Sequence, residues 1–321
     1  KLMNLNQLYL NSYLDNLICF EKKPHIAVGV SGGPDSMCIT HLLNRWIKLK
    51  KGKLSALVFD HGIRNNSKEE SLQVREMLTK ILKTEAIIIK PNKNTLIKKN
   101  MSSARTNRFE GLINFCNKNN ISHLFLGHHI DDNLETFLIR KINGSNLEGL
   151  GSIDKIAYYK NIQILRPLIE VNKTSILKYN QKNKINYLND PSNTDVNYTR
   201  VKVRNFLKKK NIKKTVKEDF YNLKKQIPSY KKMIWELFLT ILCDVKSHKI
   251  KIRFDKFIKF DRLIIEKHIL LVLKYLNKNN LTKSSKINIF IDSLKNPNFK
   301  IFNLSGVIIE KKTNSLFFSL K

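Results

Sequence analysis

Short apolar runs rich in β-branched residues alternate with longer helical patterns over the first 207 residues. Five of these runs predict strands, at His25–Val30, Leu54–Asp60, Glu85–Lys90, Ile121–Gly127 and Ile162–Leu165. Because the runs are apolar almost throughout, helices should cover both faces of the sheet. The pattern therefore predicts an α/β fold with a doubly wound parallel sheet, which binds ligands at the carboxyl ends of its strands.

The pattern changes after residue 207, where lysine becomes frequent and the apolar positions recur with helical spacing. We expect helices at Asp219–Gln226, Tyr230–Val245 and Asp261–Leu276, with Asp261 as a helix cap. Two strands are expected in the tail, at Phe299–Ile309 and Ser315–Leu320. The chain should thus divide into a catalytic domain at 1–207 and a smaller, basic C-terminal α+β domain at 208–321.

The charge of the chain indicates the kind of partner it binds. Lys and Arg number 59 against 26 Asp and Glu, which gives a formal net charge of +33. A field of this sign attracts polyanions, so nucleic acid is the expected partner, although the Lys and Asn bias of an A+T-rich genome also explains part of the excess. The charge is uneven, because Asp131–Glu135 is locally acidic whereas one short stretch contains Lys208, Lys209, Lys210, Lys213 and Lys214.

Two absences narrow the class of protein. The sequence has no apolar run near the roughly 18 residues that cross a bilayer and no signal-peptide pattern at Lys1–Leu10, so we expect a cytoplasmic protein without membrane contact. The four cysteines never form C-x-x-C, which argues against a zinc ribbon or a local redox pair.

A phosphate-binding loop is expected directly after the first strand. Ser31-Gly32-Gly33-Pro34-Asp35-Ser36 joins that strand to a predicted helix at Met37–Leu49. Two glycines allow close approach of the backbone, and the N–H groups at a helix start bind anions. The loop is neither a Walker A motif nor G-x-G-x-x-G. Asp35 beside phosphates requires either a Mg²⁺ between them or a capping role for its carboxylate.

Two other interpretations of this loop remain open. Gly29-Val30-Ser31-Gly32-Gly33 also fits G-x-S-x-G, the nucleophile elbow of α/β-hydrolases. Its place after the first strand, and the lack of a His-Gly-Gly-Gly segment, argue against that interpretation. The segment is also compatible with an ordinary glycine-rich turn.

Further polar residues follow the second strand and lie on a predicted helix. Asp60 and His61 come at the carboxyl end of an apolar strand, where a plain turn is the alternative. Arg105 and Arg108, three positions apart on a helix, share one face and suit phosphates, although a solvated basic face has the same pattern.

The fourth strand leads into a cluster of histidines and carboxylates. His128, Asp132 and Glu135 are spaced by four and three, so they are expected to converge on one side of the following helix. Three roles compete: a capping box that uses Asp132 and Glu135, a metal site, or an acidic pocket for a cationic amine with His128 assisting proton transfer.

The loop S-G-G-x-D-S resembles the pyrophosphate loop of the ATP pyrophosphatases, which have an adenine nucleotide α-hydrolase-like fold and split ATP between its α and β phosphates. Over roughly residues 25–205 the ordered motifs closely resemble the tRNA(Ile)-lysidine synthetase family: S-G-G-P-D-S, D-H-G-I-R, A-R-x-x-R-F, G-H-H-x-D-D-x-x-E-T, R-P-L and D-P-S-N-x-x-x-x-Y-x-R. One departure is Val201, where the family usually has Asn.

The resemblance implies a ligase that uses ATP and Mg²⁺, with tRNA(Ile) bearing a CAU anticodon and free L-lysine as partners; a homodimer is left open. It implies catalytic roles for Asp35, Arg108, His128, Asp132 and Glu135, and metal binding by Asp35. The nucleotide would be held by Ser31, Gly32, Gly33, Pro34, Asp35, Ser36, Asp60 and His61. The alternatives are a tRNA thiolase of the same superfamily, an amidotransferase-type synthetase and a non-catalytic RNA-binding protein.

Overall fold

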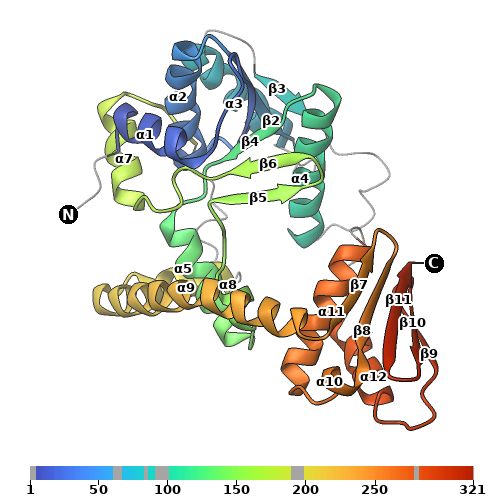
Figure 1. Ribbon diagram of the computed structural model, residues 1–321. Helices are drawn as coiled ribbons and strands as arrows, with labels where there is room; N and C mark the ends of the chain where they lie inside the picture. The colour runs from blue at the N-terminus through green and yellow to red at the C-terminus, as the bar shows by residue number, and fades with distance from the viewer. Residues whose placement is uncertain are drawn as a thin grey trace. The chain divides into compact units, whose positions relative to one another are not determined.

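The computed structural model describes residues 5–60, 67–82, 86–90, 101–188, 199–277 and 282–320. The chain forms two compact units, Lys1–Leu223 and Lys224–Lys321 (Figure 1). The units divide further along the chain than residue 207, where the sequence placed the change of domain. The assignment of catalysis to one part and RNA binding to the other stays a prediction.

The first unit is built on a six-stranded sheet with the order β3-β2-β1-β4-β6-β5. Neighbouring strands are parallel except β5 and β6, which are antiparallel. The predicted α/β fold with a mainly parallel sheet is confirmed, and each of the five predicted strands is present. The strands are β1 (His25–Val30), β2 (Lys53–Phe59), β3 (Ile87–Ile89), β4 (His123–Leu126), β5 (Ile156–Tyr159) and β6 (Ile162–Leu165).

Helices cover both faces of this sheet because alternate strand residues point to opposite sides. Ile26 and Val28 of β1 belong to one buried cluster, whereas Ala27 between them belongs to another. The first face is covered by α1 (Gln7–Leu17), α2 (Pro34–Leu49), α3 (Ser67–Leu82) and α7 (Lys173–Lys182), and the second by α4 (Met101–Lys118).

The strand order places a topological switch point between β1 and β4. From β1 the chain proceeds outward to β2 and β3, and it then returns to β4 on the other side of β1. The loops that leave these two neighbouring strands diverge, which opens a crevice at their carboxyl ends. The glycine loop, Ser31-Gly32-Gly33, follows β1, and the histidine segment, Gly127-His128-His129, follows β4.

A helical layer follows this sheet in the same unit. It contains α5 (Ile130–Ile142), α6 (Leu147–Leu150), α8 (Thr199–Leu207) and the start of α9 (Lys210–Leu239). Phe137 of α5 packs edge-on against Phe220 of α9, with ring centroids 5.5 Å apart. This packing explains why the first unit extends beyond residue 207.

Helix α9 corrects the prediction of two helices at Asp219–Gln226 and Tyr230–Val245. It runs continuously from Lys210 to Leu239 and contains Pro228. Proline lacks the N–H for one helical hydrogen bond, and its ring clashes with a carbonyl of the preceding turn. A helix that ends near Pro228 is therefore the simpler prediction. The end of the second predicted helix is instead a strand.

The second unit is an antiparallel sheet with the order β7-β8-β11-β10-β9 and helices packed on one face (Figure 1). Its strands are β7 (Leu242–Lys246), β8 (Lys249–Arg253), β9 (Ile301–Leu304), β10 (Val307–Lys312) and β11 (Ser315–Leu320). Its helices are α10 (Phe254–Phe257), α11 (Arg262–Leu276) and α12 (Ser284–Ser293). The predicted smaller α+β part is confirmed.

Details of this unit differ from the sequence prediction. The expected strand at Phe299–Ile309 is two strands, because Ser305 and Gly306 turn the chain with positive φ angles of 55° and 88°. Asp261 occupies the N-cap position of α11, but its side chain makes no capping hydrogen bond. Among the helices of the described ranges, none is both long enough and apolar enough to span a bilayer.

Candidate active site

The loop after β1 is held by its two serines. The N–H of Ser31 donates to Oγ of Ser36 at 3.2 Å, and this hydroxyl donates to the carbonyl oxygen of Gly33 at 2.9 Å. Helix α2 starts at Pro34, and its N-cap, Gly33, provides no side-chain acceptor for the first N–H groups. The helix start therefore presents donors and a partial positive charge, as an anion site requires.

Glycine is required at two positions around this loop. Gly32 has a φ of +81°, and a Cβ there would lie 2.4 Å from Cγ2 of Val74. At Gly127, after β4, a Cβ would lie 3.0 Å from the carbonyl group of Asp35. The loops after β1 and β4 are therefore packed against each other at the switch point.

A cavity of about 160 Å³ lies at this junction. It is lined by residues from three of the predicted motifs: Ser31, Asp35 and Ser36 from the first loop, Arg108 from α4, and His128 after β4. The remaining lining residues are largely apolar, including Leu57, Phe59 and Leu126. Motifs separated by up to about a hundred residues thus share one partly enclosed space.

Asp35 has cationic and histidine neighbours that the sequence analysis did not identify. Nζ of Lys173, the first residue of α7, lies 2.6 Å and 2.7 Å from the two carboxylate oxygens of Asp35. Nε2 of His129 lies 3.6 Å from Oδ1 of the same carboxylate. The position of Lys173 shortly after Arg166-Pro167-Leu168 was the available signal, but sequence spacing alone did not connect it to Asp35.

The histidine segment contains a capping box that differs from the expected one. Helix α5 begins at Ile130, so His128 precedes it and His129 is the N-cap. The N–H of His129 donates to Oδ2 of Asp132 at 2.9 Å, and the side chain of His129 accepts from the N–H of Asp131. Asp132 is therefore a capping residue, as one interpretation had it, but its partner is His129 and not Glu135.

The surroundings of Asp132 favour its charged form. Burial alone would raise the pKa of this carboxyl, but His129, His128, the His129 N–H and Arg200 together lower it below its ordinary value. Asp132 therefore remains an anion at neutral pH, one helical turn from the cavity-lining segment.

Glu135 has its own cation. It is almost fully buried, and Arg204 of α8 donates to both of its carboxylate oxygens, from Nε at 2.7 Å and from Nη2 at 3.3 Å. This hydrogen bond raises the pKa of Arg204, against the opposing effect of burial. Asp131, in turn, pairs with Lys213 at 2.7 Å. The acidic stretch 131–135 is thus neutralised by basic residues from α8 and α9.

Other predicted site residues lie outside this arrangement. Gly32, Gly33 and Pro34 shape the loop without lining the cavity, and Asp60 donates its N–H to the carbonyl of Ile89 at 2.9 Å. His61 lies outside the described residues. Among the described residues no three His, Cys, Asp or Glu side chains form a metal-binding group, which disfavours the metal-site interpretation of His128, Asp132 and Glu135.

The alternatives based on nucleophilic or sulfur chemistry gain no support. Oγ of Ser31 lies 3.3 Å from Oγ of Ser36, whereas a nucleophile elbow needs its serine against a histidine. Burial raises the pKa of the Cys116 thiol to about 12 and that of Cys38 further, so neither is a thiolate at neutral pH.

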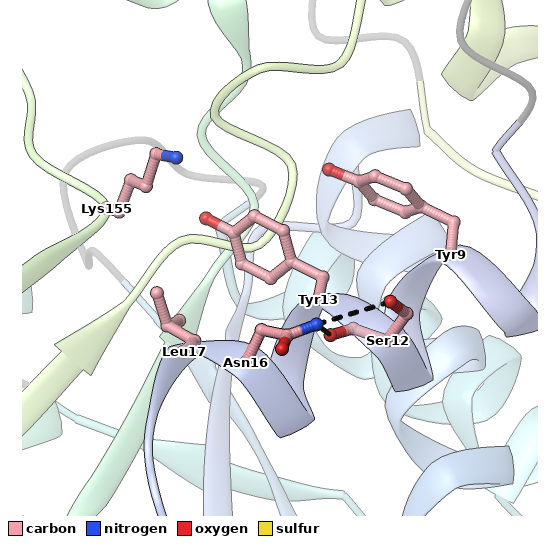
Figure 2. Close-up of a pocket in the computed structure, with 6 residues that line it drawn as sticks. All are labelled: Tyr9, Ser12, Tyr13, Asn16, Leu17 and Lys155. Carbon is pink, nitrogen blue, oxygen red and sulfur yellow. Dashed lines mark hydrogen bonds between the residues drawn. The ribbon is translucent and has the colours of Figure 1, made fainter.

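A larger hollow of about 360 Å³ lies elsewhere in the first unit, along α1 (Figure 2). Figure 2 shows the ring of Tyr13 between Lys155 and Tyr9, with the side chain of Asn16 donating to the carbonyl oxygen of Ser12. None of the motif residues lines this hollow. The predicted site residues gather instead at the smaller cavity, which the loop, Arg108 and His128 line together.

A glycine loop that opens a helix at the switch point of a parallel sheet defines this unit as an α/β nucleotide-binding domain. The family model described as a PP-loop domain matches residues 3–211. The chain belongs to this PP-loop family.

Named relatives narrow the comparison. The chain is 34% identical to the tRNA(Ile)-lysidine synthase of Orientia tsutsugamushi over 61% of its own length, but it spans only 44% of that relative. It is 27% identical to the tRNA(Ile)-lysidine synthase of Mycoplasma mycoides over 94% of its length and 75% of the relative. Among solved structures it is similar to the U34-tRNA thiolase of Methanococcus maripaludis, with a TM-score of 0.55, 19% identity, and coverage of 71% and 78% of the two chains. At 19% identity, the similarity to this solved structure supports the fold alone.

Proposed function

We propose that this chain is a tRNA(Ile)-lysidine synthase. ATP would adenylate the C2 oxygen of the cytidine at the first anticodon position of a CAU tRNA(Ile). The ε-amine of free lysine would then attack C2 and release AMP. The observation that carries the proposal is the single cavity shared by the phosphate loop, Arg108 and His128, in a chain whose named relatives have this activity.

The activation half of the reaction is assigned to the loop after β1. Its backbone N–H groups and the hydroxyls of Ser31 and Ser36 would hold the pyrophosphate portion of ATP. Asp35 fits a Mg²⁺ role because it lines the cavity and its carboxylate already attracts a cation, Lys173. A bound Mg²⁺ would offset the charge that develops on the leaving pyrophosphate. Arg108 would stabilise the phosphate or the adenylated base.

The transfer half needs an amine site and a proton acceptor. Lysine's ammonium has an ordinary pKa of about 10.4, so a proton must leave before it attacks. Asp132, whose pKa is lowered, suits the binding of an ammonium better than the removal of its proton. We therefore assign proton transfer to His128, which lines the cavity. Glu135 would contribute to the lysine site only when Arg204 shares or leaves its carboxylate.

A tRNA thiolase is the nearest alternative within the fold. All four cysteines lie in the described part of the chain, and no metal-binding group of three is found there. Two of them are buried with raised pKa values. The cysteines therefore give no support to sulfur transfer or cluster binding.

The direct test incubates the purified chain with ATP, Mg²⁺, radiolabelled lysine and unmodified CAU tRNA(Ile). We expect label in the RNA and release of equal amounts of AMP and pyrophosphate. The Asp35→Asn variant should lose both, because it removes the carboxylate proposed to hold Mg²⁺. Pyrophosphate release that needs tRNA but transfers no lysine would refute the proposed second step, and label transfer from a sulfur donor would favour the thiolase.

A further inference from the structure

The C-terminal sheet has one face packed on helices and one outer face. Ile250 and Ile252 of β8 and Leu316 and Phe318 of β11 are buried in the core of this unit. Successive strand residues point to opposite sides, so the residues between them form the outer face. At its centre lie Lys249 and Lys251 of β8 and Phe317 of β11, which is only half-buried.

Two lysine ammonium groups lie over one aromatic ring on this face. Nζ of Lys249 lies 4.8 Å from the centre of the Phe317 ring, and Nζ of Lys251 lies 5.5 Å from it. On the next strand, Lys246 stands directly opposite Lys249 in the register. Like charges facing each other across two strands destabilise a sheet. Two lysines over one ring, with a third lysine opposite one of them, therefore form a site whose charge favours an anionic partner.

The acidic residues on the same face leave this site positive. Asp244 stands opposite Lys251, without an ion pair between their side chains among the described contacts. Glu310 pairs with Lys312 on its own strand, at 3.0 Å. Arg253, at the end of β8, is held by Asp255. Among the described contacts of the sheet, the acidic side chains thus leave at least two of Lys246, Lys249 and Lys251 without a neutralising carboxylate.

We propose that the outer face around Phe317 binds an unpaired nucleotide of RNA. The base stacks on the ring of Phe317, and Lys246, Lys249 and Lys251 bind the adjoining phosphates. Every base offers a π-face, and the lysines of β7 and β8 lie on one side of the ring, where they can bind the phosphates that adjoin the stacked base. The inference deepens the proposed function, since it assigns a tRNA contact to the second unit.

Stacking on Phe317 and the charge of the lysines make separable contributions to RNA affinity. Loss of one stacking ring weakens binding of single-stranded nucleic acid by about tenfold to hundredfold. Each lysine that neutralises a phosphate adds about 0.7 to the slope of log affinity against log salt for a single strand. Phe317→Leu should therefore lower RNA affinity without changing that slope. Lys249→Gln combined with Lys251→Gln should lower both.

The test measures binding of the full chain to unmodified CAU tRNA(Ile) and to polyphosphate, which has charge but no base. We expect Phe317→Leu to weaken tRNA binding at least tenfold and to leave polyphosphate binding unchanged, and Phe317→Trp to retain tRNA affinity. Lys311→Gln is the matched control, because Lys311 also lies over a ring, that of Phe254 at 4.3 Å, but on the opposite side of the sheet.

Unchanged tRNA affinity in both the Phe317→Leu and the Lys249→Gln/Lys251→Gln variants would overturn the inference. So would an equal loss in Lys311→Gln. Melting temperatures of all variants show whether each is folded, and the lysine pair provides a test that keeps Phe317 in place. Lysine transfer by the unaltered chain is scored separately. If that transfer fails while Phe317→Leu still loses tRNA affinity, the proposed reaction is wrong and the RNA surface stands.

Discussion

Lys173 places its ammonium group 2.6 Å and 2.7 Å from the two carboxylate oxygens of Asp35, a residue 138 positions earlier in the chain. The two meet because α7 packs against α2, whose first turn contains Asp35. A carboxylate beside an incoming triphosphate would repel it, and the lysine offsets that charge. The pair therefore links α7 to the loop after β1.

Lys173→Met should weaken the use of ATP. Without the ammonium group, Asp35 presents its full charge to the phosphates, so we expect the KM for ATP to rise by about tenfold, equivalent to roughly 1.4 kcal/mol. The measurement is ATP-dependent AMP release over a range of ATP concentrations. Lys178→Met, on an exposed position of the same helix, is the control. Equal KM values for both variants would show that Lys173 is only a structural counter-ion.

Gly32→Ala tests the backbone of the phosphate loop. A side chain at a φ of +81° is strained by about 1–3 kcal/mol, and its Cβ would lie 2.4 Å from Val74. We expect loss of measurable ATP binding by calorimetry. Gly33→Ala should retain binding, since a Cβ there meets only Oγ of Ser31 at 3.7 Å. The prediction fails if both variants bind ATP alike.

The strands of the first unit were predictable because burial on both faces requires apolar runs. Strand β5 was missed for the opposite reason, since Ile156–Tyr159 forms the sheet edge and exposes Tyr158 and Tyr159. In the second unit β7 was predicted as part of a helix. Its residues are mostly exposed and include Asp244, so apolar residues recur with neither the strand period of two nor the helix period of 3.6.

The site was predictable in its motifs but not in its pairings. The sequence identified Ser31, Asp35, Arg108 and His128, and the described structure places them around one cavity. The sequence did not indicate that Arg204 binds Glu135, because that contact joins two helices through residues 69 positions apart. An ion pair of this kind depends on packing, which periodicity and local spacing do not encode.

Arg204→Leu should destabilise the first unit. Glu135 has a side chain only 2% exposed, and the substitution leaves its charge without a partner. Removing one member of a buried ion pair costs about 3–5 kcal/mol; because the side chain of Arg204 is 39% exposed, we expect about 2 kcal/mol. Urea unfolding measures the loss. Adding Glu135→Leu should restore most of it.

Lys213→Gln is the control for the Arg204→Leu variant, because Lys213 pairs with Asp131 by a single nitrogen. We expect a loss of about 0.5 kcal/mol from it. If Arg204→Leu costs no more than Lys213→Gln, the prediction is wrong. The bidentate pair would then have no stabilising role.

Asp132→Asn separates helix capping from lysine binding. The pKa of Asp132 is lowered from 3.8 on folding, so its charge contributes stability that is fully present above pH 3.8. That contribution is lost as the pH falls through the lowered pKa. The variant should therefore be less stable than the unaltered chain by about 1 kcal/mol at pH 7, and the difference should shrink in acid.

The same variant also tests the amine site. If Asp132 binds the lysine ammonium, Asp132→Asn should raise the KM for lysine by tenfold or more and leave the KM for ATP unchanged, because a neutral amide attracts a cation far less than a carboxylate does. Asp219→Asn, which removes an exposed carboxylate paired with Lys141, is the control for charge. A normal KM for lysine together with the expected acid profile would restrict Asp132 to capping α5, and the lysine site would then have to depend on Glu135 after displacement of Arg204.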